Sequence, residues 1–411
     1  MYVTLRDRPA GEQKPPISRA ARRVAATVLL LGITSMLTDV SSEMVNAILP
    51  IYLTTEVGIG LIGYGFVDGL YQGVSAVLRI GGGFASDRGH PKWVAASGYI
   101  LSALTRIAML PVHGMAGISA VITVDRLGKG LRTAPRDKLI ADASDPAQLG
   151  RAFGVHRALD TLGAALGPLV AFGLLLAVPR GYDAIFVASF AFAVVGVAVI
   201  VLFVPDRKTE PGRPRLPIGR LFKALADRRL RKPLTAAGLL GVFTVGDGFL
   251  YLSLQHRDDF TTKLFPLLYV GTNIAYLVLA IPMGRLADRI GRARVLIGGH
   301  VALLAGYLVA AAPLGGPQWT VLVLLLLGVF YSATDGVLPA LISHLLPAEV
   351  RGSAIAAAQT VVVVARLVSS LGFGVLWAST SRASALFTVA ILLTCAIPVA
   401  AGLLRGIRHA Q

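Results

Sequence analysis

The sequence predicts an all-α membrane protein with twelve transmembrane helices in two pseudo-symmetric six-helix bundles. Three observations lead to this fold class. Apolar residues make up 55% of the chain, charged residues only 15%, and the mean hydropathy is +0.70. A soluble globular chain carries roughly 25% charged residues. The apolar residues also form runs long enough to cross a bilayer, and two motifs recur with one spacing.

The apolar runs define the expected helices. A helix needs roughly 20 apolar residues to cross the hydrocarbon core of a bilayer. Because lipid cannot satisfy open backbone N–H and C=O groups, each run is expected to be helical. Taken by length, the runs are 25-53, 60-83, 94-112, 116-134, 154-178, 183-204, 234-254, 264-283, 294-312, 319-342, 353-377 and 383-404.

The recurring motifs indicate a duplicated unit of about half the chain. The segment 83-89, with its Asp-Arg pair, recurs 201 residues later at 284-290. Pro146 and Pro347 have the same offset. Pseudo-twofold halves built of hydrophobic helices are typical of secondary transporters.

The basic residues predict the orientation in the membrane. They give the chain a net charge of +17 and gather in the tail 1-23 and the central loop 205-233. The alternate loops hold few cations, namely Arg180, Arg257, Lys263 and Arg382. This is the positive-inside pattern, so the charge indicates topology rather than nucleic-acid binding. Both termini are expected in the cytoplasm of a multi-pass protein of the cytoplasmic (inner) membrane.

The same pattern divides the chain into segments. The first residues are polar, and the run that follows is too long for a signal peptide. A single cysteine, Cys395, excludes an internal disulfide and a cysteine cluster for metal. The expected segments are a cytoplasmic tail 1-23, an N-terminal bundle 24-204, a basic linker 205-233, a C-terminal bundle 234-404 and a cytoplasmic tail 405-411.

The repeated loop resembles the cytoplasmic loop signature of the major facilitator superfamily. The resemblance implies a cytoplasmic gate whose Asp and Arg pair with neighbouring helix ends during transport. The alternative is that the cations only fix the orientation of the chain in the membrane and that the acid caps a helix. A duplicated acid, which topology alone does not require, favours the gate. The predicted gate residues are Gly83, Asp87, Arg88, Gly284, Asp288 and Arg289.

The fifth expected helix resembles the glycine pattern of the drug:proton antiporters of that superfamily. Small residues at such intervals allow close helix packing, and a Gly-Pro step permits a bend. The pattern's last glycine pair is replaced by Ala171-Phe172. Ordinary small-residue packing is the alternative reading. The matching residues are Gly154, Gly163, Gly167 and Pro168.

The fourth expected helix resembles the family's Arg-Gly signature. Arg126 and Gly130 match, Lys129 replaces a Gln, and Arg132 replaces the second Gly. A charge near the middle of the membrane is costly unless paired or hydrated, so Arg126 marks a transport pathway. Lys129, Arg132 and Arg136 follow on a common sector, where cations near the helix end can also extend to water.

The first expected helix carries a polar stripe that includes two carboxylates. Asp39 and Glu43 are one turn apart, and Arg126 is their expected partner. Two carboxylates in a poorly hydrated place resist ionising together, so one is expected to exchange a proton near neutral pH. A static buried ion pair is the alternative. The stripe also includes the expected cavity-lining residues Ser35, Ser42 and Asn46.

Other ionisable residues fall within the predicted membrane spans. In the second half, the expected cavity-lining residues are Asp247, Tyr331, Asp335 and Arg366, the last as an ion partner. His156 and Asp160 lie one turn apart beside Arg157, but they are too few for a metal site. The remaining embedded charges are Asp68, Arg79 and Arg106.

The motifs identify the chain, by resemblance, as a member of the major facilitator superfamily nearest its drug:proton antiporters. The resemblance implies alternating access, no cofactor, and a monomer in the lipid bilayer that binds a small-molecule substrate and protons. The expected function is proton-coupled export of a drug-like or amphiphilic compound. One alternative is transport of an anionic organic solute, an organophosphate or carboxylate. Another is a membrane sensor or scaffold that transports nothing. No nucleophile-base set or phosphate-cradling glycine loop appears, so an enzyme is not expected.

Overall fold

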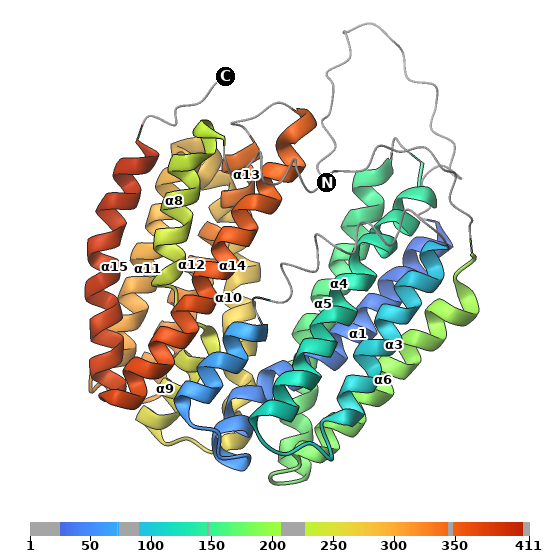
Figure 1. Cartoon of the computed structure of the whole chain (residues 1–411), viewed down its shortest axis with the longest axis horizontal. Coiled ribbons are helices and arrows are strands. Elements are labelled where there is room, and N and C mark those ends of the chain that lie inside the picture. The colour runs from blue at the N-terminus through green and yellow to red at the C-terminus, as the bar shows by residue number, and fades with distance from the viewer. Residues whose placement is uncertain are drawn as a thin grey trace, which may run out of the picture.

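The computed structural model describes residues 25–71, 73, 90–145, 148–206, 227–343 and 348–405, and the regular elements in these ranges are helical. They form two groups (Figure 1). The first group contains α1 (Ala26–Ile51), the π-helix η2 (Tyr52–Glu56), the helix 61–71, α3 (Pro91–Ala108), α4 (Met115–Asp142), α5 (Leu149–Ala177) and α6 (Tyr182–Phe203). The second contains α8 (Arg228–Val242), α9 (Asp247–Asp258), the 3₁₀-helix η4 (Thr262–Leu264), α10 (Phe265–Ile290), α11 (Arg292–Ala311), α12 (Pro317–Thr334), α13 (Val337–Ser343), α14 (Ala348–Ser379) and α15 (Arg382–Leu404).

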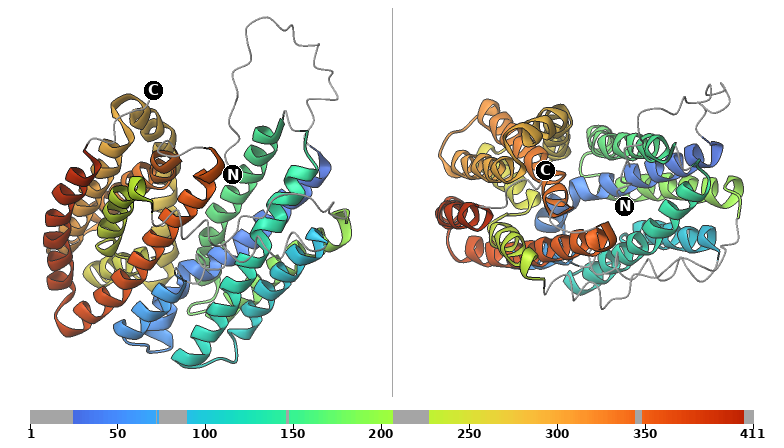
Figure 2. Two further views of the ribbon diagram at one scale, coloured as in Figure 1. Left: turned by 45° about the horizontal axis from the view of Figure 1, so that its top comes forward. Right: turned by 90° about the horizontal axis from the view of Figure 1, so that it is seen from above.

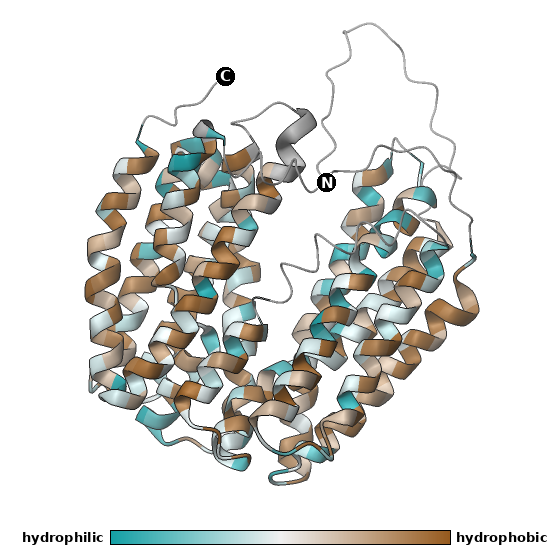
Figure 3. Ribbon diagram, in the orientation of Figure 1, coloured by the Kyte–Doolittle hydropathy of each residue, from teal (hydrophilic) through white to brown (hydrophobic). Residues whose placement is uncertain are grey.

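Apolar residues predominate along many of the helices of both groups, such as α6 and α15 (Figure 3). Leu202, Val278 and Ile281 are 71%, 67% and 65% exposed, which suits contact with lipid chains and not with water. Within the described residues, nine helical segments are long and apolar enough to cross a membrane. The expected spans 94-112 and 116-134 correspond to the more polar helices α3 and α4.

Two expected spans are discontinuous helices, and one of them, 319-342, is divided into α12 and α13. The run 234-254 is divided into α8 and α9 by a non-helical step at Phe243–Gly246. Tyr307 of α11 stabilises this step, because its hydroxyl accepts a hydrogen bond from Val245 N at 2.7 Å and donates one to Phe243 O at 3.1 Å. A single side chain therefore satisfies two backbone groups that lipid could not.

The two groups approach each other at one end and diverge at the other (Figures 1 and 2). The near end includes η2, the end of α9 and the start of α10, and the far end includes the start of α1 and the end of α15. Gly248 of α9 has no space for a side chain, because a Cβ there would collide with the Tyr64 hydroxyl. Tyr64 in turn packs edge-on against Phe249, with ring centroids 4.7 Å apart.

Two glycines set the crossing of α1 and α5. A Cβ on Gly163 would collide with the Met36 carbonyl, and one on Gly167 would lie 2.8 Å from the Val40 carbonyl. Pro168 is buried beside them in α5. In contrast, Gly154 has no atom of another segment within 4 Å of its Cβ position. The glycine pattern thus brings the two helix backbones together at two of its three glycine positions.

Candidate functional site

The polar stripe of α1 has a buried part that bonds to α3 and a part that is only half-buried. Ser35 and Ser42 are 2% and 3% exposed and bond to α3, Ser35 to the Tyr99 hydroxyl at 3.1 Å. Asn46 donates to a Glu43 oxygen at 3.0 Å, on the same helix. Asp39, Glu43 and Asn46 are only partly buried. The serines therefore anchor α1, while the acids lie on its more open face.

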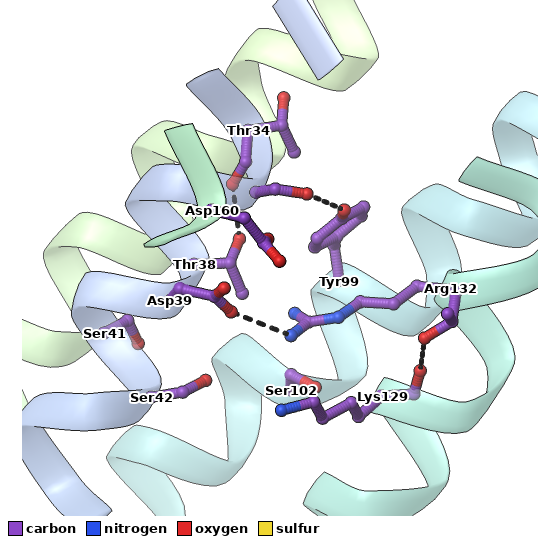
Figure 4. Close-up of polar contacts among 12 residues, drawn as sticks. Thr34, Thr38, Asp39, Ser41, Ser42, Tyr99, Ser102, Lys129, Arg132 and Asp160 are labelled. Atoms are coloured by element: carbon purple, nitrogen blue, oxygen red, sulfur yellow. Dashed lines mark hydrogen bonds and ion pairs between the residues drawn. The ribbon is translucent and has the colours of Figure 1, made fainter. Parts of the chain in front are cut away.

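Asp39 lies against a second carboxyl group, that of Asp160 on α5 (Figure 4). The two side chains are within hydrogen-bonding reach of each other. Arg132 of α4 lies on the other side, with its Nη2 3.9 Å from Asp39 Oδ1. Two carboxyl oxygens can share a hydrogen bond only when one carries a proton, so this pair is suited to holding a single proton.

The close crossing of α1 and α5 produces this pair. Asp160 is three residues before Gly163, and Asp39 is three residues after the Met36 carbonyl on which Gly163 packs. Residues three apart lie on one helix face. A side chain at position 163 would therefore push the two carboxyl groups apart. The sequence pattern pairs Asp160 only with His156 and Arg157 of its own helix, and it does not predict the contact with Asp39.

Arg126 has a partner that sequence analysis did not name. Its Nε donates to Asp125 Oδ2 at 3.0 Å, and its Nη2 forms an ion pair with the same oxygen. Arg106 of α3 donates from Nη2 to Asp125 Oδ1 at 2.7 Å and to Ser42 at 3.0 Å. The Arg126 guanidinium also lies 3.9 Å from the centre of the Tyr71 ring. Arg126 thus belongs to a buried Arg-Asp-Arg cluster, and its ion pair is with Asp125 rather than with an acid of α1.

One further cation of α4 has a buried donor that is unsatisfied. Arg132 is 4% exposed, and its Nη1 is buried with no hydrogen-bond partner. Within the described part of the chain, the Lys129 ammonium donates no hydrogen bond, although it interacts electrostatically with Asp39 and Glu43. Arg136 is different, because it donates to Asp137 at 2.9 Å and to Ser35 at 3.2 Å.

The second group contributes a separate polar cluster. Tyr331 of α12 donates to Asp247 Oδ1 at 2.5 Å, at the first residue of α9. Arg366 of α14 is close enough to Asp247 and Asp335 to interact with both electrostatically. Asp335 is exposed at the end of α12. The structure therefore brings together the predicted cavity residues of the second half, but it does not bring them to Asp39.

The predicted gate residues are only partly described. Gly83, Asp87 and Arg88 lie outside the described residues. In the second copy, Asp288 pairs with Arg292 at 3.2 Å, one turn along the chain. Arg292 also donates to the Ala340 carbonyl at 3.4 Å, and both Asp288 and Arg289 are exposed. Within the described part of the chain, Gly284 has no atom of another segment within 4 Å of its Cβ position. These contacts lie within the second group.

His156 of α5 is buried with neither ring nitrogen bonded, and it is 4% exposed. Asp160, one turn along, interacts with Arg157 at 3.8 Å. In the described ranges, no cluster of three or more His, Cys, Asp or Glu residues could hold a metal ion. This part of α5 offers titratable groups rather than a ligand set.

Comparison with known proteins shows the same fold and family throughout. A sequence profile described as Major Facilitator Superfamily matches residues 31–370 and 257–410. An uncharacterised MFS-type transporter of Methanocaldococcus jannaschii is 32% identical over 372 residues, covering 87% of this chain and 89% of that protein. The multidrug resistance protein MdtH of Photorhabdus laumondii is 28% identical over 190 residues, 45% of each chain.

Solved structures agree with these matches. The crystal structure of a mutant of the nucleoside transporter NupG superposes with a TM-score of 0.81 at 15% identity, covering 92% of this chain and 100% of that one. A POT family transporter in complex with 5-aminolevulinic acid gives 0.78 at 12% identity, covering 91% and 95%. The predicted fold class, an all-α membrane protein of twelve helices, is confirmed.

Proposed function

Because this chain belongs to the Major Facilitator Superfamily and is a secondary transporter, not an enzyme, we propose that it couples transport to protons and exports a drug-like or amphiphilic compound. The observation that carries the proposal is the carboxyl pair Asp39–Asp160 beside Arg132. The pair is accessible, since the two side chains are 19% and 18% exposed. A site for exchangeable protons needs both a shared proton and access to water.

A cationic group of the substrate would compete with the proton at this pair. A unit positive charge about 4 Å away is worth roughly 4 kcal/mol at an effective dielectric constant near 20. Its arrival favours the fully ionised pair and expels the shared proton. Proton and substrate then occupy the site alternately, and alternating access converts a proton gradient into export.

Two observations support the drug:proton branch of the family. Gly163 and Gly167 occupy the positions of that branch's helix-5 pattern and pack directly on the α1 backbone. The partial similarity to MdtH, a multidrug resistance protein, points in the same direction. In this proposal Asp39 and Asp160 bind the proton, and Glu43 with its bonded Asn46 lines the site. Arg126, fixed by Asp125, supplies positive charge without contacting the pair.

The second candidate is an anionic organic solute, which is favoured by the buried, unsatisfied Nη1 of Arg132 and by the Lys129 ammonium near it. A buried donor without a partner costs roughly 1–3 kcal/mol. A carboxylate or phosphate between the two cations would accept those bonds. An anion would bind better when the carboxyl pair is protonated, because the local charge is then more positive. Protons would then move in the same direction as an anionic solute, whereas they would move in the opposite direction to a cationic one.

The orientation and the remaining site roles belong to the same proposal. Both termini would lie in the cytoplasm, as the distribution of basic residues favours. Tyr331, Asp335 and Arg366 would line the second group's side of the pathway, near Asp247. The duplicated Asp-Arg loops would close the cytoplasmic side. The protein would act as a monomer.

Substrate-driven pH change in proteoliposomes tests the proposal. Purified protein is challenged with a panel of lipophilic cations and organic anions, and the wild type is compared with Asp39→Asn. Glu56→Gln is the matched control, since it removes a carboxylate that pairs with Arg180 on the exposed surface. Proton movement opposite to a cation, lost in Asp39→Asn and kept in Glu56→Gln, is the expected result.

Two other results would change the proposal. Protons that move together with an anion, through the same residue, would select the second candidate. Flux of any solute that survives Asp39→Asn with unchanged proton coupling would remove the carboxyl pair from the mechanism.

A further inference from the structure

One carboxylate of the first group reaches into the second group. Asp68, on the helix 61–71, accepts a hydrogen bond from the Ser370 hydroxyl of α14. Gly246, the N-cap of α9, provides space for the same carboxylate, because a Cβ there would lie 2.6 Å from Asp68 Oδ2. Asp68 therefore contacts two elements of the opposite group, at the step that interrupts α8 and α9.

The helices that carry this contact pack backbone to backbone. A Cβ on Gly65 would lie 2.5 Å from the Ser370 carbonyl, and one on Gly374 would lie 2.6 Å from the Leu61 carbonyl. Gly69 faces the Leu367 carbonyl at 3.3 Å in the same way. Small residues allow such close approach in membranes, where dispersion and polar contacts hold helices together. We call this interface, formed by the helix 61–71 and α14, the glycine seam.

The charges around Asp68 are incompletely balanced. Among the described residues, Arg366, one turn before Ser370 on α14, is the cation that acts on Asp68. It also acts on Asp247 at the start of α9 and on Asp335. Among the described residues, the other titratable groups near Asp68 are Asp247 of α9 and two tyrosines, Tyr64 on its own helix and Tyr269 on α10. Arg366 therefore interacts with three carboxyl groups, of which Asp335 also interacts with Arg157. A charge within the membrane is costly unless it is paired.

We propose that Asp68 is a second coupling residue of the transport cycle, which holds the glycine seam closed when ionised and releases it when protonated. The groups must separate at this end for the site to open there. Separation removes the ionised carboxylate from both Ser370 and Arg366, so it is costly. A proton taken up on Asp68 abolishes the attraction to Arg366 and leaves only a neutral hydrogen bond to break.

This role differs from that of the Asp39–Asp160 pair. Asp68 contacts the opposite group and acts on the conformational step, whereas Asp39 and Asp160 lie within the first group. The inference does not depend on the charge of the solute. It can fail while the carboxyl pair still couples transport, and the reverse is also true.

Distance measurement between spin labels tests the inference. Labels replace Thr55 and Ser379, which are exposed on opposite groups at the seam end, in a Cys395→Ser background that removes the lone cysteine. Wild-type protein in lipid nanodiscs should show a short distance at alkaline pH and a growing long-distance population at acidic pH. Asp68→Asn should show the long population at both pH values, with the closed-to-open ratio lowered roughly 10- to 100-fold.

Two variants make the test specific. Asp247→Asn removes a carboxylate that interacts with both Arg366 and Asp68, but its bond to Tyr331 stays within the second group. The pH at which the seam opens should therefore shift while the pH response itself persists. Ser370→Ala removes only the hydroxyl donor, so it should open the seam partly at alkaline pH and keep the pH response. If Asp68→Asn does not fold, Ser370→Ala still tests whether the contact between Asp68 and Ser370 holds the seam closed.

Three outcomes would overturn the inference. The first is a wild-type distance distribution and pH response in Asp68→Asn. The second is loss of the pH response in Asp247→Asn to the same degree, which would assign it to the whole cluster. The third is a Ser370→Ala protein whose seam stays as closed as in the wild type.

Discussion

Replacing Asp125 with Asn should destabilise the fold far more than its single lost charge suggests. Asp125 is the shared anion of two buried guanidiniums, since Arg106 and Arg126 are 5% and 2% exposed. Removing one partner of a buried ion pair costs about 3–5 kcal/mol, because a charge is left uncompensated. Here two cations lose their anion, although Arg106 keeps Ser42 and Arg126 keeps the Tyr71 ring. The free energy of unfolding is expected to fall by an amount in the upper part of that range.

The assay is reversible unfolding of the purified protein in mixed detergent micelles, followed by tryptophan fluorescence. Glu56→Gln is the matched control, because its partner Arg180 is 72% exposed and such surface pairs contribute little. The double variant Asp125→Asn with Arg106→Met restores the charge balance and should recover much of the loss. An Asp125→Asn protein no less stable than Glu56→Gln would refute the view that this cluster is energetically coupled.

Three further changes test other parts of the structure. Gly163→Leu should cost about 1–3 kcal/mol by overpacking and abolish proton-coupled flux by separating α1 from α5, whereas Gly154→Leu, with open space around it, should do neither. Tyr307→Phe should cost roughly 1–3 kcal/mol, measured by the same unfolding assay, because Val245 N and Phe243 O lose their shared partner. Thr320→Val should cost a similar roughly 1–3 kcal/mol, since Thr320 bonds to Asp258 at 2.6 Å and to Arg257 at 3.0 Å. An unchanged unfolding midpoint in either of the last two would contradict the assigned contacts.

The fold class was predictable because it depends on run length and hydropathy. A bilayer imposes a minimum length on each helix, and that length is visible in the chain without any knowledge of packing. The helix-5 pattern was informative for a similar reason. Gly163 and Gly167 are small because another backbone is close, and that constraint leaves a mark on the sequence.

The partners of charged residues were harder to predict. Asp125 is adjacent to Arg126 in the chain and forms its ion pair, whereas the polar stripe of α1 had suggested Asp39 and Glu43 as its partners. The rotation of α4, which places both side chains in the interior, is a property of packing. Asp160 and Asp39 meet only because α1 and α5 cross at Gly163.

The interruption of the span 234-254 is a second feature that the sequence did not predict. Its apolar run predicts one continuous helix, and the step at Phe243–Gly246 is stabilised by a tyrosine on another helix. The contact of Asp68 with Ser370 likewise joins residues from opposite groups. Neither feature has a local signal, since each depends on which helices become neighbours.

The most direct test of the account is infrared difference spectroscopy of the protein during a pH titration in lipid. A protonated carboxyl group has its own C=O stretching band, which an ionised one lacks. The account predicts such a band near neutral pH that is lost in both Asp39→Asn and Asp160→Asn and kept in Asp247→Asn. A spectrum in which neither Asp39→Asn nor Asp160→Asn changes any protonated-carboxyl band would contradict the shared proton, and with it the proposed coupling site.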